Sequence, residues 1–189
     1  MGDIGSGKSF IAKLFRYPVF NADKVVSKIY RKDINCFKKL KKKFPTYIKS
    51  FPIKKTELIK LISHNRNNLK KISSVIHPIV RKKMSIFLKE NKHSKMVILD
   101  IPLLIENKIN KKNDILLFVN AKKRIILKRI KQRKNYNKKI FNNLKQNQHA
   151  LLRKRKLANY IIDNNFSINI MRSKVKLLKN KIIYERISS

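Results

Sequence analysis

Apolar and polar positions divide the amino-terminal part of the chain into three elements. Apolar residues at helical spacing predict a helix over residues 7–15, and the apolar run 18–21 predicts a short buried strand. A second helix with an apolar stripe is expected over 22–30. This order places the acidic residue Asp23 at the carboxyl end of a strand, where open α/β sheets bind ligands.

Residues 33–95 show helical periods and no convincing strand. Pro45 and Pro52 mark a loop between the first two helical groups. We expect this stretch to form a helical insertion with a basic face. Within it, His77 precedes Pro78 on a largely apolar surface, which by itself favours a structural histidine over a catalytic one.

Strands return in the second half of the chain. Residues 96–106 give the clearest strand prediction, because their near-continuous apolar run is typical of a parallel sheet covered on both faces, and Asp100 and Glu106 flank its turn. Residues 114–120 predict a further buried strand, and 121–132 predict a helix.

The carboxyl-terminal part begins with a polar segment, 134–149, that we expect to form a mobile helical lid. A helix over 151–160, a short strand over 160–164 and a terminal helix over 168–187 follow. Alternating helices and strands of this kind indicate an α/β fold with a parallel sheet, here as one domain over residues 1–189.

The formal net charge of +39 would attract any polyanion. Lysine greatly outnumbers arginine, however, and isoleucine and asparagine are also abundant, as in proteins encoded by DNA rich in A and T. Proteins that bind nucleic acids specifically favour arginine for contacts with bases, and aromatic residues are interspersed among their basic residues. We therefore expect no specific nucleic-acid binding, and a basic RNA-associated protein remains the alternative from another class.

Cysteine use and apolar run lengths bear on the compartment. The only cysteine, Cys36, cannot form an internal disulfide and is expected to be a packing residue. The sequence has no apolar run of membrane-spanning length and no pattern of a cleaved leader. A monomeric cytoplasmic enzyme without a membrane partner is the expectation.

The first nine residues carry the clearest chemical signal. They fit the phosphate-binding pattern G-x-x-x-x-G-K-[ST], and all three glycines of the chain lie within them. Successive backbone N–H groups in such a loop point into one anion-sized hollow. The fixed positions are Gly2, Gly7, Lys8 and Ser9, and the residues between them are Asp3, Ile4, Gly5 and Ser6. Lys8 would meet the β- and γ-phosphates and Ser9 would offer a hydroxyl to Mg²⁺.

Taken in order, the motifs resemble those of the dephospho-CoA kinase family over nearly the whole chain. The turn from Asp100 to Glu106 and the carboxyl-terminal motif that ends at Asn164 are much more specific than the phosphate loop alone. The matching segments are the loop 2–9, Asn21-Ala22-Asp23, His77-Pro78, Asp100-Ile-Pro-Leu-Leu-Ile-Glu106, and Gln148 followed by Lys154-Arg155 and Ile162-Asp163-Asn164.

The resemblance implies a three-layer P-loop kinase fold with a parallel sheet of order 2-3-1-4-5. It implies transfer of the γ-phosphoryl group of ATP to the ribose 3′-hydroxyl of dephospho-CoA, the last step of coenzyme A synthesis. Lys8 and the loop would hold ATP, and Ser9 would help to place Mg²⁺. Asp23 would orient or deprotonate the hydroxyl, with capping of its helix as the structural alternative. Asp100 would assist Mg²⁺ through water, or else cap the end of its strand.

Further roles are implied for residues beyond the loop. Arg129 and Arg133 match arginines around the family's lid and would neutralise transferring charge, although they also fit ordinary solvated helix residues. The insertion 33–95 would form much of the acceptor side, with His77 and Arg81 near the acceptor. Another small P-loop nucleoside or nucleotide kinase is the alternative within the same class.

Four departures from the family pattern are visible. Asn21 and Asn159 replace acidic residues, and Asp3 adds a negative charge beside the phosphate site. Only Met1 precedes the loop, whereas the motif normally follows a buried strand. We therefore expect an in-frame apolar stretch of roughly five to eight residues upstream of the Met1 codon, the length of an ordinary strand.

Overall fold

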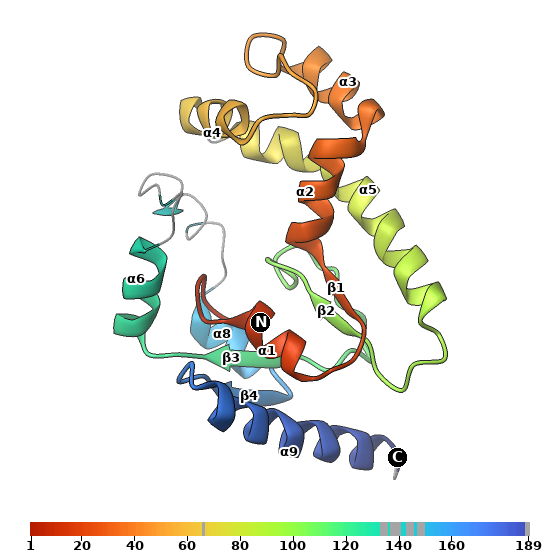
Figure 1. The fold of residues 1–189 in the computed structure, drawn as a ribbon, viewed down its shortest axis with the longest axis vertical. Coiled ribbons are helices and arrows are strands. Elements are labelled where there is room, and N and C mark those ends of the chain that lie inside the picture. The colour runs from red at the N-terminus through yellow and green to blue at the C-terminus, as the bar shows by residue number, and fades with distance from the viewer. Residues whose placement is uncertain (66, 133–135, 137–140, 143–145, 147–149, 188–189) are drawn as a thin grey trace.

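Among the residues that the structure describes, four short strands form two parallel pairs (Figure 1). The computed structural model describes residues 1–65, 67–132, 136, 141, 142, 146 and 150–187. In it, β1 (Val19–Asn21) pairs with β2 (Ile98–Asp100). Likewise, β3 (Leu117–Asn120) pairs with β4 (Tyr160–Asp163). The described strands therefore confirm the predicted parallel α/β arrangement.

Residues 1 and 2 run alongside β3. Gly2 forms a parallel bridge with Val119, and the Val119 amide donates a hydrogen bond of 2.8 Å to the Met1 carbonyl. In the expected order 2-3-1-4-5, the pairs β1–β2 and β3–β4 take the positions 2-3 and 4-5. Met1 and Gly2 hold the place of strand 1 beside β3, so the phosphate loop starts at the carboxyl edge of the strands.

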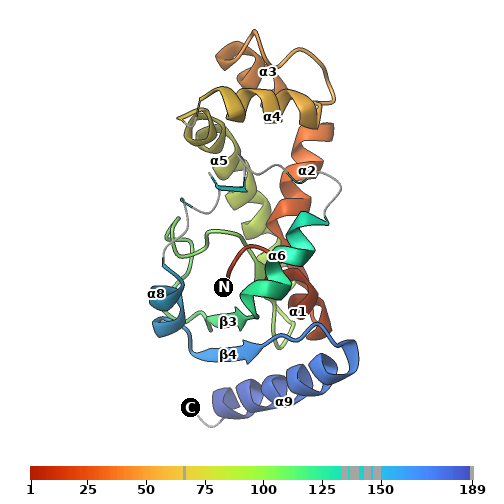
Figure 2. The ribbon, with the colours of Figure 1, turned by 90° about the vertical axis from the view of Figure 1, so that its left-hand side faces the viewer.

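Two helices pack on the β3–β4 pair. Helix α1 (Lys8–Leu14) begins directly after the loop, and α9 (Ile168–Ile187) closes the described chain at the end opposite α3 and α4 (Figures 1 and 2). Apolar side chains of both helices and both strands share one buried cluster, and burying them stabilises the position of α1 behind the loop. The buried members are Ile11, Phe15, Val119, Ile162, Met171, Val175 and Ile182.

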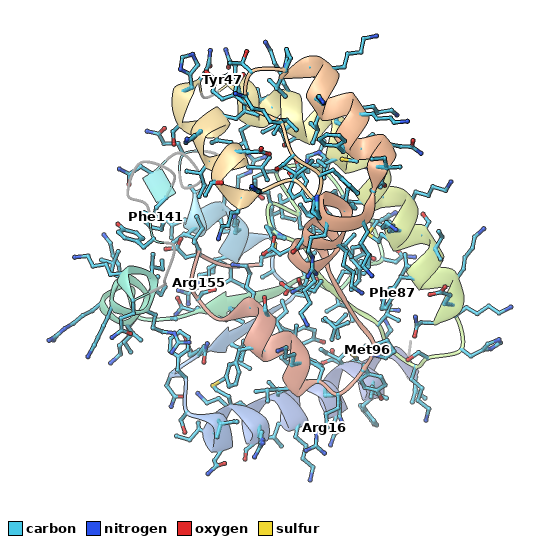
Figure 3. All side chains as sticks on the ribbon, turned by 45° about the horizontal axis from the view of Figure 1, so that its top comes forward. Arg16, Tyr47, Phe87, Met96, Phe141 and Arg155 are labelled. Carbon is cyan, nitrogen blue, oxygen red and sulfur yellow. The ribbon has the colours of Figure 1, made fainter. Side chains whose placement is uncertain are left out.

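Residues 33–95, predicted as a helical insertion, contain α3 (Ile34–Lys43), α4 (Lys55–His64) and α5 (Asn67–Glu90). Together with the preceding helix α2 (Ala22–Lys32), they form a helical body with its own apolar core. Cys36 is fully buried in this core, which agrees with a packing role. Figure 3 shows Tyr47 at this end of the molecule and Arg16 at the other, beside α1.

Helix α5 connects the helical body to the strands. It continues through Pro78. Near its end, the centroid of the Phe87 ring lies 5.5 Å from the centroid of the Phe20 ring of β1, and the two rings are tilted by 52°. Aromatic pairs at this separation and tilt are favourable beyond their buried area. Because α2 starts immediately after β1 and α5 returns to the same strand, the helical body is attached to the strands through both.

The remaining described helices flank the loop, and they are shorter than predicted. Helix α6 covers Lys123–Lys131, and α8 covers Leu151–Lys156 rather than 151–160. The reason for the early end of α8 is Asn159, whose side chain accepts a 2.8 Å hydrogen bond from the Leu116 amide. Its own amide donates to the Leu116 carbonyl, so pairing with the β3 segment replaces the last helical turn.

Two predictions concern residues that are only partly described. The proposed lid, 134–149, lies outside the described residues except at four positions, and Arg133 and Gln148 also lie outside them. Within the described ranges, none of the helices combines the length and apolar character that crossing a membrane would require.

Candidate active site

The phosphate loop is shaped by glycines whose backbone and surroundings exclude other side chains. Gly5 and Gly7 have φ angles of +86° and +90°, in the left-handed region that glycine adopts without steric cost. A Cβ atom on Gly5 would lie 2.8 Å from the Ile130 side chain of α6. A Cβ atom on Gly7 would lie 2.3 Å from the Asn164 amide nitrogen. The loop is therefore held between α6 and the segment that follows β4.

Asn164 fastens the loop from behind. Its side chain is 3% exposed, and its Nδ2 donates a 2.8 Å hydrogen bond to the Ser6 carbonyl. Its Oδ1 accepts a 2.9 Å hydrogen bond from the Phe166 amide. Both ends of the buried amide are thus paired, as burial of a polar group requires. The sequence identified Asn164 only as the end of a motif, and the structure shows its contact with the loop.

Lys8 brings its ammonium group to the inside of the loop. Its Nζ donates to the Asp3 carbonyl at 2.8 Å and to the Gly2 carbonyl at 3.3 Å. Burial lowers the pKa of Lys8 below its ordinary value, and the nearby charge of Lys154 acts in the same direction. The negative charges of Asp100, Asp3 and Asp23 raise the pKa of Lys8 and so oppose this shift. Lys8 therefore lies within electrostatic range of Asp23 and Asp100, the two acidic residues predicted to act in the reaction.

The carboxyl ends of β1 and β2 join two site segments through one side chain. Asn21 and Asp100 are register partners, and Asn21 Nδ2 donates a short hydrogen bond to the Asp100 carboxylate. The Asn21 Oδ1 also accepts a 2.8 Å hydrogen bond from the Lys24 amide, so Asn21 is the N-cap of α2. Asp23 lies exposed in the first turn of α2 and is not the cap. Its alternative role as helix cap is therefore wrong, because Asn21 fills it.

A buried ion pair lies beside the loop. Lys154 Nζ is 2.6 Å from Glu106 Oε1, and both side chains are less than a tenth exposed. Glu106 belongs to the turn after β2, whereas Lys154 belongs to α8. These two residues and Lys8 line the same small hollow. The ion pair connects the turn from Asp100 to Glu106 with the motif that includes Lys154, and the sequence alone predicted no contact between these two motifs.

Arg129 reaches toward the loop from α6. Its guanidinium carbon lies 4.2 Å from the centroid of the Phe166 ring, a close cation–π contact. A Cβ atom on Gly7 would lie 3.1 Å from the same ring, so Phe166 stands between Arg129 and the loop. The structure thus brings Arg129 to the site.

His77 and Arg81 lie one turn apart on α5, in the helical body. His77 is half-buried and Arg81 is exposed. Burial lowers the pKa of His77, and the neighbouring charge of Arg81 lowers it further. The two residues are therefore brought together, but they belong to the helical body and not to the cluster around Lys8.

Two of the described site residues, Ser9 and Asp100, carry oxygen atoms that could help to hold a magnesium ion. Ser9 is exposed in the first turn of α1, and the buried Asp100 carboxylate lies near Lys8. Hydroxyl and carboxylate oxygens are ligands that Mg²⁺ accepts, and it usually keeps waters and binds phosphates in addition. Among the described residues, no group of three histidine, cysteine or acidic side chains forms a metal cage.

A glycine-rich phosphate loop that leads into helix α1, with a lysine inside the loop, is characteristic of P-loop nucleotide-binding proteins. A family model described as dephospho-CoA kinase matches residues 1–169 of the chain. The chain therefore belongs to the dephospho-CoA kinase family, and it is a kinase of coenzyme A biosynthesis.

Individual relatives agree with this assignment. The dephospho-CoA kinase of Wolbachia pipientis wMel is 33% identical over 180 residues, which cover 93% of this chain and 92% of the relative. The dephospho-CoA kinase of Bartonella henselae is 31% identical over 189 residues, with coverage of 95% and 96%. The crystal structure of TT1252 from Thermus thermophilus matches with a TM-score of 0.73 and 26% identity, covering 95% of this chain and 94% of that one. The dephospho-CoA kinase from Campylobacter jejuni shares the fold, with a TM-score of 0.64 and 23% identity over 96% and 94% of the two chains.

Sequence reasoning missed one contributor to the site. Phe166 lies in no motif and follows the last strand in a polar stretch, so no periodic signal identified it. Glu106, Lys154 and Asn164 were all within recognised motifs, but spacing along the chain does not reveal which residues pair.

Proposed function

We propose that the loop 2–9 holds ATP and that its γ-phosphoryl group passes to the ribose 3′-hydroxyl of dephospho-CoA. In this reaction the hydroxyl oxygen forms a bond to the γ-phosphorus, and the bond from that phosphorus to the oxygen of the leaving ADP breaks. Phosphoryl transfer depends mainly on positioning and charge stabilisation, which a rigid loop with an internal lysine provides. The observation that carries the proposal is the placement of Lys8, which lies inside the loop and within electrostatic range of Asp23 and Asp100.

Asp23 is the proposed base or orienting group for the acceptor hydroxyl. Its exposed position in the first turn of α2 leaves its carboxylate accessible to a substrate, and helix capping is assigned to Asn21. Accepting the hydroxyl proton as the bond to phosphorus forms is the task of an aspartate in other phosphotransferases.

Mg²⁺ would supply neutralisation of phosphate charge when bound with ATP. We propose that the Ser9 hydroxyl helps to hold it and that Asp100 assists through a water molecule. Asn21 donates to one Asp100 oxygen and so fixes the direction of that carboxylate. Arg129, and Arg133 beyond the described residues, would neutralise charge on the transferring group.

The acceptor side is assigned to the helical body. We propose that residues 33–95 form much of this side, with His77 and Arg81 near the acceptor and residues 134–149 acting as a lid. The link of α2 and α5 to β1 supports this assignment, because it attaches the helical body beside Asp23. A monomeric cytoplasmic enzyme without specific nucleic-acid binding completes the proposal.

The test compares Lys8→Ala with Lys13→Ala, an exposed lysine of the same helix. We expect Lys8→Ala to lower kcat/KM with ATP and dephospho-CoA by about 10²–10³-fold, with an unchanged circular dichroism spectrum, and Lys13→Ala to behave like the wild type. Adenosine and AMP serve as competing acceptors for the wild type. Better turnover of either than of dephospho-CoA would contradict the proposed acceptor, and tight RNA binding that ignores Lys8→Ala would favour the RNA-associated alternative.

A further inference from the structure

We propose that Phe166 is a positioning residue that holds Arg129 against the phosphate loop. The inference rests on the proposed function in one respect, namely that Arg129 acts on the transferring phosphoryl group. It adds a residue outside every motif of the sequence, and it explains how an exposed arginine on α6 acquires a defined place in the site.

The Phe166 ring restricts the side chain of Arg129. Arg129 is exposed on α6, and a long side chain at such a position samples many rotamers. The Phe166 ring limits this freedom, because the guanidinium lies 4.2 Å from the ring centroid. Arginine stacks readily on aromatic faces, and this contact leaves the N–H groups at the edge of the guanidinium available to donate to phosphate oxygens.

The Phe166 ring is itself held in place by the backbone around it. Phe166 has a φ angle of +65°, a left-handed conformation that is uncommon for a bulky residue and is maintained only where the surroundings enforce it. The enforcing contact is the hydrogen bond from the Phe166 amide to the Asn164 side chain. The other end of the Asn164 amide is bound to the Ser6 carbonyl.

These contacts form a continuous path from the loop to the guanidinium. The path runs from Ser6 through Asn164 to Phe166 and then to Arg129. Gly7 lies beside both middle residues, since a Cβ atom added there would lie 2.3 Å from the Asn164 amide nitrogen and 3.1 Å from the Phe166 ring. Phe166 is half-buried and lies outside the buried apolar cluster formed by α1, α9 and the strands. The position of the Phe166 ring therefore fits a role in linking the loop to Arg129 better than a role in the buried apolar cluster.

The first experiment separates the ring from the rest of the side chain. We expect Phe166→Leu to lower kcat by about 10–100-fold because the arginine is misplaced, with KM for ATP within about twofold of the wild type. Phe166→Tyr, which keeps the aromatic face, should retain most of the activity. The double variant Arg129→Ala/Phe166→Leu should be no slower than Arg129→Ala alone, since the ring acts through the arginine. Arg124→Ala, another exposed arginine of α6, is the matched control and should leave kcat unchanged.

The second experiment does not depend on turnover. The chain has six tyrosines but no tryptophan, so Phe166→Trp introduces a single tryptophan that can be excited selectively and that keeps an aromatic face for the cation–π contact. We expect Arg129→Ala in this background to shift the emission of Trp and increase its accessibility to acrylamide, while Arg124→Ala leaves both unchanged. This measurement also serves if Phe166→Leu fails to fold.

Four results would overturn the proposal: unchanged kcat in folded Phe166→Leu, a raised KM for ATP with unchanged kcat, multiplicative losses in the double variant, or Trp emission indifferent to Arg129→Ala. The second of these would mean that the ring binds the nucleotide directly. If the wild type does not phosphorylate dephospho-CoA but the fluorescence still responds to Arg129→Ala, the proposed function fails and the contact stands.

Discussion

Lys154 and Glu106, which are far apart in the sequence, form a buried ion pair at 2.6 Å next to the phosphate loop. Removing two charges from water is costly, and an apolar pair of similar size often stabilises a fold equally well. The pair fixes the turn after β2 to α8, and its lysine acts electrostatically on Lys8. It therefore joins the two chain segments that border the loop.

This geometry predicts an asymmetric response to mutation. Lys154→Met should reduce the free energy of unfolding by about 3–5 kcal/mol, because it removes the cation that pairs with the buried Glu106 carboxylate. The double variant Lys154→Met/Glu106→Leu should recover most of the loss. Urea unfolding measures both, and Lys181→Met, which breaks an exposed pair with Glu185, is the control with little expected effect. Equal losses in the single and double variants would contradict the prediction.

Asn21 and Asp23 should respond differently, although only one residue separates them. Asn21→Ala removes the N-cap of α2 and should cost about 1 kcal/mol of stability, measured by thermal unfolding. Asp23→Asn should keep the stability of the wild type and lower kcat by about 10²-fold or more, since a catalytic base is lost. A stable Asp23→Asn enzyme with normal kcat would remove Asp23 from the mechanism.

Gly7→Ala should damage the loop in two ways. The residue adopts a φ of +90°, and the new Cβ would lie 2.3 Å from the Asn164 amide nitrogen. We expect a loss of more than about 1 kcal/mol in unfolding free energy together with loss of ATP binding by calorimetry. Normal ATP affinity in this variant would show that the contact with Asn164 is dispensable.

His77 should make stability depend on pH. Burial, assisted by Arg81, lowers its pKa in the folded protein, whereas the unfolded chain takes up the proton near the ordinary value of about 6.5. The unfolded state therefore binds more protons as the pH falls through this range. The contribution of neutral His77 to the free energy of unfolding is fully present above about pH 6.5, and it is lost as the pH drops toward the lowered pKa of the folded protein.

Two variants check this assignment. His77→Gln should flatten the dependence of unfolding free energy on pH below about pH 6.5. Arg81→Gln should raise the pKa of His77, as measured by NMR titration, whereas Lys82→Gln, an exposed neighbour on the same helix, serves as the control. A pKa of His77 that does not respond to Arg81→Gln would show that burial alone sets it.

Sequence patterns predicted most elements because helical and strand periods are local properties. The terminal helix was predicted over 168–187, which matches α9, and the helical character of 33–95 is confirmed. Strand and helix ends were less accurate, as for 151–160, because a tertiary hydrogen bond between Asn159 and Leu116 ends α8.

The residue pattern alone indicates phosphate binding, since three glycines, Lys8 and Ser9 at fixed spacing can form a phosphate cradle. It also contains the motifs that led to the family. The folded structure, in contrast, is needed to show which distant side chains meet: Asn164 with Ser6, Lys154 with Glu106, Asn21 with Asp100, and Phe166 with Arg129. These pairs are set by how strands and helices pack in three dimensions, and spacing along one chain carries no record of that packing.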